Sequence, residues 1–104
     1  MIDNIQPPAA PKTVGEAVDI LMAELPIKSR TDLTNIPEEH LVNLRLTFGI
    51  HIRDKFRLDT GNRDLLASCR ELSQDKYLHH SQAPYVIIKA LWKRLQETHK
   101  LRVV

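Results

Sequence analysis

The longest periodic stretch of the chain lies in its middle, over Leu41–Leu58, and reads LVNLRLTFGIHIRDKFRL. Its apolar residues recur at three- and four-residue steps, so they share one face of an α-helix. They are Leu41, Leu44, Phe48, Ile52 and Phe56, with Val42, Leu46 and Gly49 widening the face. The pattern predicts one central helix from about Pro37 to Arg57, against which the other elements pack. Glycine inside a helix costs up to ~1 kcal/mol relative to alanine, so we expect another backbone to lie close to Gly49.

Two further long helices are predicted, one before and one after the central helix in the sequence. Residues 13–16, TVGE, have the form of a capping box, and the apolar period that follows predicts a helix over Val14–Leu25, which Pro26 ends. Ser81 is expected to cap the last helix, with Pro84 tolerated in its first turn. The buried stripe of this helix is expected to contain Ile87, Ile88, Leu91 and Leu95, with Trp92 at its edge.

Shorter elements are predicted in the two remaining segments. One or two helical turns are expected around Arg30–Thr34. Asn62 is expected to cap a short helix that buries three apolar residues, which are Leu65, Leu66 and Cys69. Residues 70–80 show no clean period and are predicted to form a loop. The pattern therefore predicts an all-α, small single-domain bundle of three main helices plus one or two short helices.

Both ends of the chain differ from this helical core. Residues 1–12 contain Pro7, Pro8 and Pro11, which remove backbone donors and predict a flexible, removable arm. Residues 100–104 are predicted to form a tail, so the helical domain is expected to span residues 13–99.

Composition agrees with a folded helical domain and narrows its setting. Of the 104 residues, 42% are hydrophobic and 27% charged, which is typical of a globular protein. Cys69 is the only cysteine, so no internal disulfide points to an oxidising compartment. The chain shows neither a signal-peptide pattern nor an apolar run of the ~20 residues that cross a membrane. We therefore expect a cytoplasmic protein without a membrane partner.

Charge is distributed unevenly along the chain. Residues 1–50 carry four basic and seven acidic side chains and a net charge of −3, whereas residues 51–104 carry eleven and six and a net charge of +5. This asymmetry could orient an acidic partner or the two copies of a self-associating dimer, and the basic half allows the hypothesis of nucleic-acid binding, but we favour unpatterned surface charge. The cations on or after the last helix that would serve this purpose are Lys89, Lys93, Arg94, Lys100 and Arg102.

Four residues are candidates for an interaction site. Arg53, near the end of the central helix, has five donors to satisfy and could bind an anion or a partner carboxylate with Asn62 nearby. We favour a structural role, in which Arg53 ties the turn at residues 59–62 to the helix through backbone carbonyls. Tyr85 and Trp92 lie seven residues apart on one helix face and could form an exposed aromatic patch. We favour a place for both in the core or at its rim.

No catalytic, cofactor or metal site is predicted. His40 and His51 are about 16 Å apart along a helix, too far to bind one ion, and no further ligand motif accompanies His79 and His80. Pairing of Cys69 with His79 as a nucleophile lacks a signalled oxyanion site, and the helical spacing of Cys69 indicates a buried thiol. The glycine-rich phosphate-binding and nucleophile motifs are absent from the sequence.

Three segments together resemble a family of uncharacterised small bacterial helical domains, a domain of unknown function. They are AVDILMAEL, the central FGIHIRDKFRL followed by the GN turn, and VIIKALWKRL. The central segment fits F-G-x-x-I-R-[DN]-x-F-x-L and the last one fits I-I-x-A-L-W-x-x-L, and the likeness covers most of residues 13–96. The resemblance implies the fold and its boundaries, and it implies no activity.

These observations support three hypotheses about function. The leading one is a non-catalytic protein-interaction or regulatory module that binds an unknown protein partner or associates with itself. The alternative is a nucleic-acid-binding protein that uses the basic C-terminal half. The third is a small enzyme or ligand-binding domain around Arg53 and Asn62.

Overall fold

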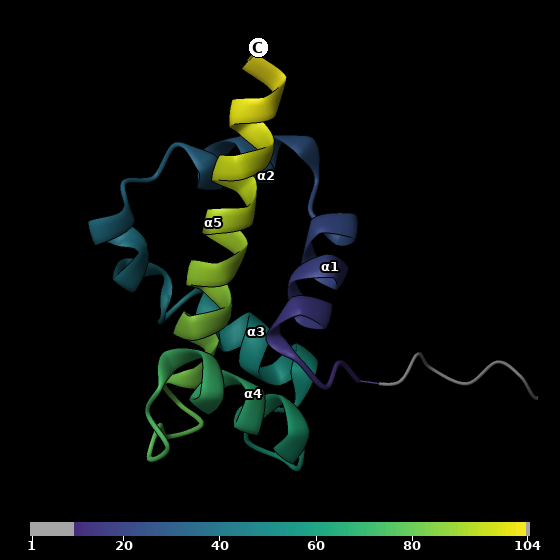
Figure 1. Ribbon diagram of the computed structural model, residues 1–104, viewed down its shortest axis with the longest axis vertical. Coiled ribbons are helices and arrows are strands. Elements are labelled where there is room, and N and C mark those ends of the chain that lie inside the picture. Colours follow the sequence, from purple (N-terminus) through teal and green to yellow (C-terminus); the bar gives the residue numbers. More distant parts are fainter. Residues whose placement is uncertain (1–9, 104) are drawn as a thin grey trace, which may run out of the picture.

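The computed structural model describes the backbone of residues 10–103 and the side chains of residues 10–98. Within this range every regular element is a helix (Figure 1). The elements are α1 (Val14–Glu24), α2 (Ile27–Thr34), the 3₁₀ helix η2 (Glu38–Leu44), α3 (Phe48–Phe56), α4 (Arg63–Ser73) and α5 (Ala83–Val103). The predicted all-α single-domain fold is therefore confirmed. None of these helices combines the length and apolarity that crossing a membrane requires.

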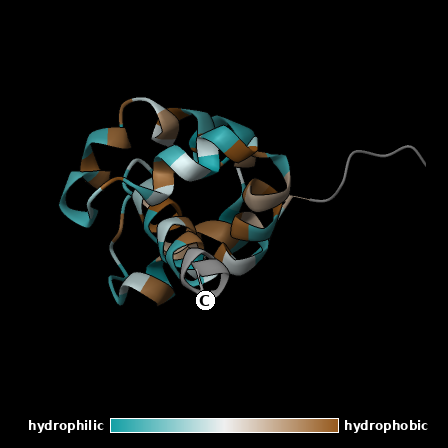
Figure 2. Ribbon diagram, turned by 90° about the horizontal axis from the view of Figure 1, so that it is seen from above, coloured by the Kyte–Doolittle hydropathy of each residue, from teal (hydrophilic) through white to brown (hydrophobic). Residues whose placement is uncertain are grey.

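The last helix, α5, is the element around which the fold is organised. It packs against α1, α2, α3, α4 and η2, and it passes through the middle of the view in Figure 1. Its 21 residues extend about 30 Å, long enough for all the other elements to contact it. The expectation that the stretch 41–58 holds this place is therefore wrong. Figure 2 shows that hydrophobic and hydrophilic positions alternate around the helices, as amphipathic packing requires.

Side chains of α5 form the centre of the core. Ile87, Ile88 and Leu91 have no exposed surface and Leu95 is buried, as the period of the last helix predicts, and Ala83 is fully buried as well. They meet buried residues from each of the surrounding elements, among which are Leu21, Leu41, Ile52 and Leu65. Fully burying one such aliphatic side chain contributes about 1.5–3 kcal/mol, so α5 carries much of the hydrophobic stabilisation.

The predicted central helix is broken into two pieces, which corrects the prediction of one helix over residues 37–57. The 3₁₀ helix η2 ends at Leu44, and α3 begins at Phe48. At the break, the carbonyl of Leu44 accepts from both the amide and the hydroxyl of Thr47, at 3.2 and 3.4 Å. Side-chain hydroxyls that bond to local carbonyls compete with helical pairing, and β-branched residues are weak helix formers.

Because of this break, two residues assigned to the buried face turn outward. Val42 is 42% exposed and Leu46 is 78% exposed. Leu41 and Ile52, on the two separate pieces, remain fully buried. Gly49 lies in the first turn of α3, where a Cβ atom would be 3.4 Å from the carbonyl oxygen of Leu44 and 3.7 Å from the Cβ atom of Pro84. These are ordinary van der Waals distances and the α5 atoms are side-chain atoms, so the close approach of another helix backbone that we expected at Gly49 is not found.

The last two residues of the expected arm contact the start of the helical domain. The predicted cap of α1 is confirmed, because the Thr13 hydroxyl accepts from the amide of Glu16 at 3.1 Å. The Glu16 carboxylate accepts from the amide of Lys12 at 2.8 Å, and Pro11 is buried. The arm boundary stays a prediction, with Pro11 and Lys12 in contact with the helices. Residues 1–9 of the expected arm lie outside the described part of the chain.

Two helix ends differ from the prediction. Helix α4 continues to Ser73, into the segment predicted as a loop. Helix α5 begins at Ala83 and continues to Val103, through residues expected to form a tail. Ser81 is not the cap that we expected, because its amide donates to Nδ1 of His79 and its hydroxyl lies 2.8 Å from the same atom. Residues 70–73 and 100–103 extend the helices through their intrinsic helix propensity, although their apolar period is too weak to predict a helix.

Candidate interaction groove

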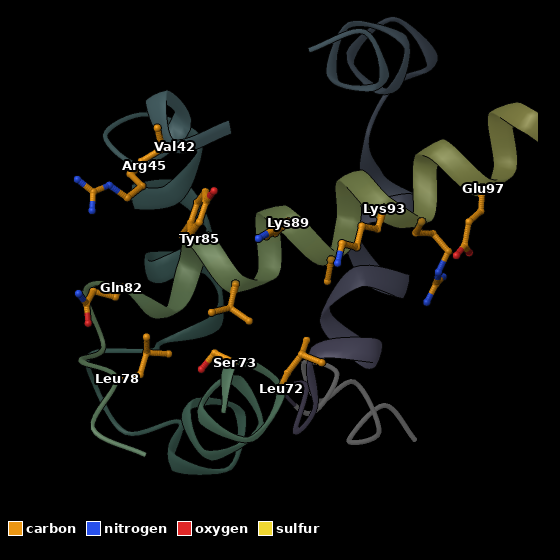
Figure 3. Close-up of a pocket in the computed structure, with 13 residues that line it drawn as sticks. Val42, Arg45, Leu72, Ser73, Leu78, Gln82, Tyr85, Lys89, Lys93 and Glu97 are labelled. Atoms are coloured by element: carbon orange, nitrogen blue, oxygen red, sulfur yellow. The ribbon is translucent and has the colours of Figure 1, made fainter. Parts of the chain in front are cut away.

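An open groove of about 760 Å³ lies along one side of α5 (Figure 3). One wall comes from η2 and the residue after it, and the other comes from the end of α4 and the loop that follows. The floor is formed by Gln82, directly before α5, and by a face of α5 whose residues recur at helical spacing, namely Tyr85, Val86, Lys89, Ala90, Lys93, Arg94 and Glu97. The opposite face of α5 is the buried one, so this is the side of the long helix that the other described elements leave uncovered.

The groove has apolar side chains on both walls and on its floor. Val42 on one wall and Leu72 on the other are 42% and 57% exposed. Tyr85, Val86 and Ala90 are half-buried on the floor between them. Covering such surface is favourable at about 25 cal/mol per Å² of apolar area. An apolar side chain from another molecule can therefore be buried here.

The polar residues of the groove are mostly cationic. Arg45, Lys89, Lys93 and Arg94 line it together with a single carboxylate, that of Glu97. Figure 3 shows Lys89 and Lys93 side by side along α5, with Arg45 on the η2 wall. A concentration of one sign of charge beside apolar surface attracts ligands of the opposite sign.

Two of these cations already contact carboxylates from the flanking helices. The Lys89 ammonium lies 3.7 Å from a carboxylate oxygen of Glu38 on η2, and the Arg94 guanidinium lies 2.9 Å from that of Asp19 on α1. These side chains are 41–68% exposed, so each pair contributes at most about 1 kcal/mol. Among the described side chains, Lys93 forms no ion pair.

A second cavity continues the groove toward the N-terminal helix. It has a volume of about 480 Å³ and lies between α1 and α4. It shares Leu72, Ala90 and Arg94 with the groove. Val14 and Val18 add apolar surface on the α1 side, and both are themselves buried. The accessible depression is therefore longer than the groove alone.

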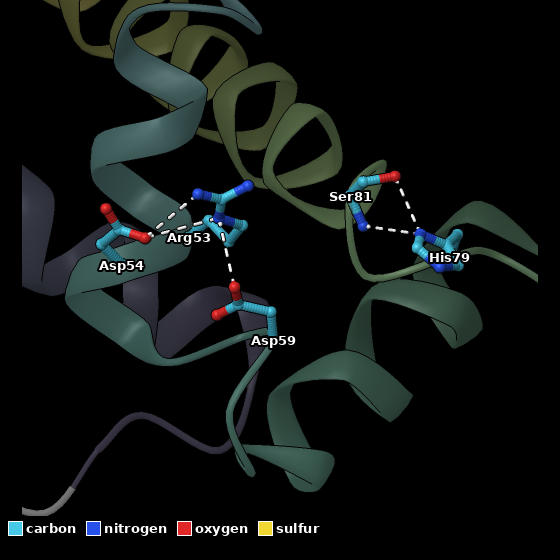
Figure 4. Close-up of polar contacts among 5 residues, drawn as sticks. All are labelled: Arg53, Asp54, Asp59, His79 and Ser81. Atoms are coloured by element: carbon cyan, nitrogen blue, oxygen red, sulfur yellow. Dashed lines mark hydrogen bonds and ion pairs between the residues drawn. The ribbon is translucent and has the colours of Figure 1, made fainter.

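Arg53 contacts carboxylates rather than the backbone carbonyls that we expected. Its Nε atom lies 3.5 Å from a carboxylate oxygen of Asp59, and its Nη2 atom lies 3.3 Å from that of Asp54 (Figure 4). The turn after α3 is closed by the backbone, since the Leu58 amide donates to the Arg53 carbonyl at 3.0 Å. With 32% of its side chain exposed, Arg53 supports the turn only weakly.

Asn62 is the residue that joins three parts of the chain. Its carbonyl oxygen accepts from the Leu65 amide at 3.1 Å and so caps α4, as predicted. Its Nδ2 atom donates to the carbonyls of Phe56 at 2.9 Å and Pro11 at 3.1 Å. The amide is occupied by these contacts, and neither Asn62 nor Arg53 lines either of the two described cavities.

The two aromatic candidates lie in different surroundings. Both are half-buried, at the rim of the core. Tyr85 lines the groove, whereas Trp92 donates from its Nε1 atom to the carbonyl of Ile36 at 2.8 Å. Trp92 and Gln96, whose amide donates to the Thr34 carbonyl at 2.6 Å, fasten α5 to the end of α2. The two aromatic residues therefore do not form one patch.

In the described part of the chain, no group of three or more cysteine, histidine or acidic side chains is placed to hold a metal ion. Cys69 is fully buried, and burial raises the pKa of its thiol to about 12, which keeps it protonated and unreactive at neutral pH. His79 lies on the exposed loop, where its Nδ1 atom contacts Ser81 (Figure 4).

Sequence reasoning missed most of the groove residues. The sequence places Lys89 and Lys93 on the last helix, where they lie, but it does not show which residues of other elements face them. Val42 was assigned to the core, and Arg45 and Leu72 carried no signal. The i, i+4 spacing of the two lysines beside Ala90 was the one indication in the sequence.

The fold and the groove define a small all-α domain with a cationic, partly apolar surface on its longest helix. The model of one family, the domain of unknown function DUF6794, matches residues 10–95, and the chain belongs to this family. Its span agrees with the resemblance seen over residues 13–96. No curated protein and no solved structure matches the chain.

Proposed function

We propose that this domain is a non-catalytic protein-interaction module that binds a segment of another protein in the groove along α5. The observation that carries the proposal is the uncovered face of α5, with apolar side chains on its floor and on both walls and cations among them. Partner segments with apolar side chains and carboxylates complement both features. As part of the proposal, we place the module in the bacterial cytoplasm, the setting expected from the resemblance and the single cysteine.

Charge favours a different protein over a second copy of this chain. In a symmetric dimer through the groove, the same cationic residues of both copies would face each other, and like charges across an interface are costly. Charge and apolarity together also favour a protein over nucleic acid. Phosphates would gain nothing from Val42, Tyr85 and Leu72, and two of the four groove cations already contact carboxylates.

Selection from a displayed library of random peptides tests this function without a known partner. The enriched peptides should combine apolar residues with Asp or Glu, and they should lose at least tenfold in affinity for the Lys89→Glu/Lys93→Glu variant. The matched control is Lys28→Glu/Lys76→Glu, because it changes the net charge by the same amount at two exposed positions outside the groove.

Two results would overturn the proposal. One is that no peptide is enriched, or that the enriched peptides bind the groove variant as well as they bind the control. The other is tighter binding of random duplex DNA, with a steep loss of affinity in salt, which would favour the nucleic-acid hypothesis instead.

A further inference from the structure

The dimensions of the groove indicate the form of the segment that fits it. Along α5 it extends from Gln82 to Glu97, a distance of about 22 Å. A partner helix of about 16 residues spans the same length. Ala90, in the middle of the floor, is small enough to let a second backbone come close.

Other common modes of peptide recognition fit these residues less well. Addition of a strand needs an exposed sheet edge, and the described residues form no strand. Binding of a polyproline segment needs a groove lined by several aromatic rings, and among the lining residues only Tyr85 is aromatic. A helix that lays one apolar face into the groove matches the length of the floor and the apolar side chains on the floor and both walls, and it fits better than either of these modes.

The charges indicate what flanks that apolar face. Lys89 and Lys93 are one helical turn apart, so their Cβ atoms are separated by about 5–6 Å. Carboxylates at the same spacing on a partner helix can meet both ammonium groups. The carboxylate of Glu38 already lies 3.7 Å from the Lys89 ammonium, so the position that a partner carboxylate would take is held by a residue of η2.

Resting on the proposed function, we infer that the partner segment is an acidic amphipathic helix, and that Glu38 competes with its carboxylates for Lys89. The exchange replaces one ion pair by another and costs little, because both side chains of the existing pair are nearly half exposed. Lys93 forms no ion pair with a described residue, and the carboxylate on its own face, that of Glu97, is one helical turn away. Lys93 therefore contributes more to binding than Lys89 does.

The chain offers a matched pair of acidic residues for the test. Glu38 and Glu39 are adjacent in η2 and both are exposed, but only Glu38 contacts a groove cation. Replacing either by glutamine changes the net charge equally. A difference between Glu38→Gln and Glu39→Gln therefore reports the local contact rather than the general attraction of an acidic peptide to a more basic protein.

The probe is a synthetic peptide of about 16 residues with leucines at helical spacing and glutamates beside them. Its affinity for the full chain is measured by fluorescence anisotropy at low salt. Glu38→Gln should bind roughly three- to fivefold more tightly than the parent, against less than twofold for Glu39→Gln. Lys93→Gln should lose more affinity than Lys89→Gln. Thermal melts confirm that each variant is folded.

Companion peptides separate the parts of the inference. A peptide with proline at its centre cannot stay helical, and a peptide with lysine in place of glutamate has the wrong charge, so both should lose binding. Retained binding of either peptide at the groove, judged by sensitivity to Lys93→Gln, would overturn the acidic helix and leave the proposed function intact. Equal effects of Glu38→Gln and Glu39→Gln would overturn the competition. Peptide binding that no groove variant changes would overturn the proposed function itself.

Discussion

Asn62 is the residue whose removal should reveal most about how the domain is held together. Asn62→Ala removes the cap of α4, which contributes about 0.5–2 kcal/mol. It also removes two hydrogen bonds, to the carbonyls of Phe56 and Pro11, that contribute about 0.5–1.5 kcal/mol each. These groups are only partly buried and water can replace some of the contacts, so we expect a loss of about 2–3 kcal/mol. For a domain of this size the melting temperature should fall by about 10–20 °C.

Asn62→Asp separates the two roles of this side chain. A carboxylate still accepts from the Leu65 amide and is favoured at a helix N-terminus, so the cap is kept. It cannot donate, and it places a negative charge against the carbonyl oxygens of Phe56 and Pro11. We therefore expect Asn62→Asp to cost about 1–3 kcal/mol at neutral pH.

Urea unfolding followed by circular dichroism measures these changes, with Asn43→Asp as the control at an exposed position. Arg53→Ala is the comparison within the same corner, and it should cost no more than about 1 kcal/mol, because its ion pairs are partly exposed. Wild-type stability of Asn62→Asp would show that the two carbonyl contacts contribute nothing. If Arg53→Ala lowers the free energy of unfolding more than Asn62→Ala does, Asn62 is not the residue that chiefly stabilises this part of the fold.

Two further predictions concern buried positions. Gly49→Ala should be neutral or should stabilise the protein by about 0.4–1 kcal/mol, since the added Cβ would make ordinary contacts. Gly49→Leu should overpack against Pro84 and Ile88 and cost about 1–3 kcal/mol in urea unfolding. A leucine variant with unchanged stability would contradict this packing. The Cys69 thiol should not react with Ellman's reagent at pH 8 until the chain is unfolded. Because burial raises its pKa from 9.0 to about 12, the native state should lose stability as the pH rises through this interval, and the Cys69→Ala variant should lose less.

The sequence predicts those parts of the fold that depend on neighbours in the chain. The cap at Thr13, the cap at Asn62 and the buried stripe of α5 all rest on residues within one or two helical turns of each other. The break at Thr47 was missed because apolar spacing continues across it, and a hydroxyl contact with the Leu44 carbonyl leaves no mark in a hydrophobic pattern. As a result, the pattern places Val42 on the buried face of a continuous helix, whereas its side chain is partly exposed.

The groove was beyond prediction because its walls are far apart in the chain. Val42, Leu72 and Lys89 come from three different elements, and no local period relates them. The same applies to Asn62, whose capping role is local but whose contact with Pro11 joins residues 51 positions apart. Which helix becomes central is also a property of the whole chain, since it depends on how many others can cover it.

Each wall of the groove is held in place by contacts with residues that do not line the groove, and this affects the free energy of binding a partner. On one side, Leu41 anchors η2 in the core with no exposed surface. On the other, the Arg70 guanidinium donates to the Leu78 carbonyl at 2.9 Å and holds the loop after α4. The floor is fixed by Trp92 and Gln96, which bond to the end of α2. Among the described side chains, the ion pair between a floor lysine and η2 is the weak Lys89–Glu38 pair, so a partner would meet a surface already in place and would lose little affinity to ordering it.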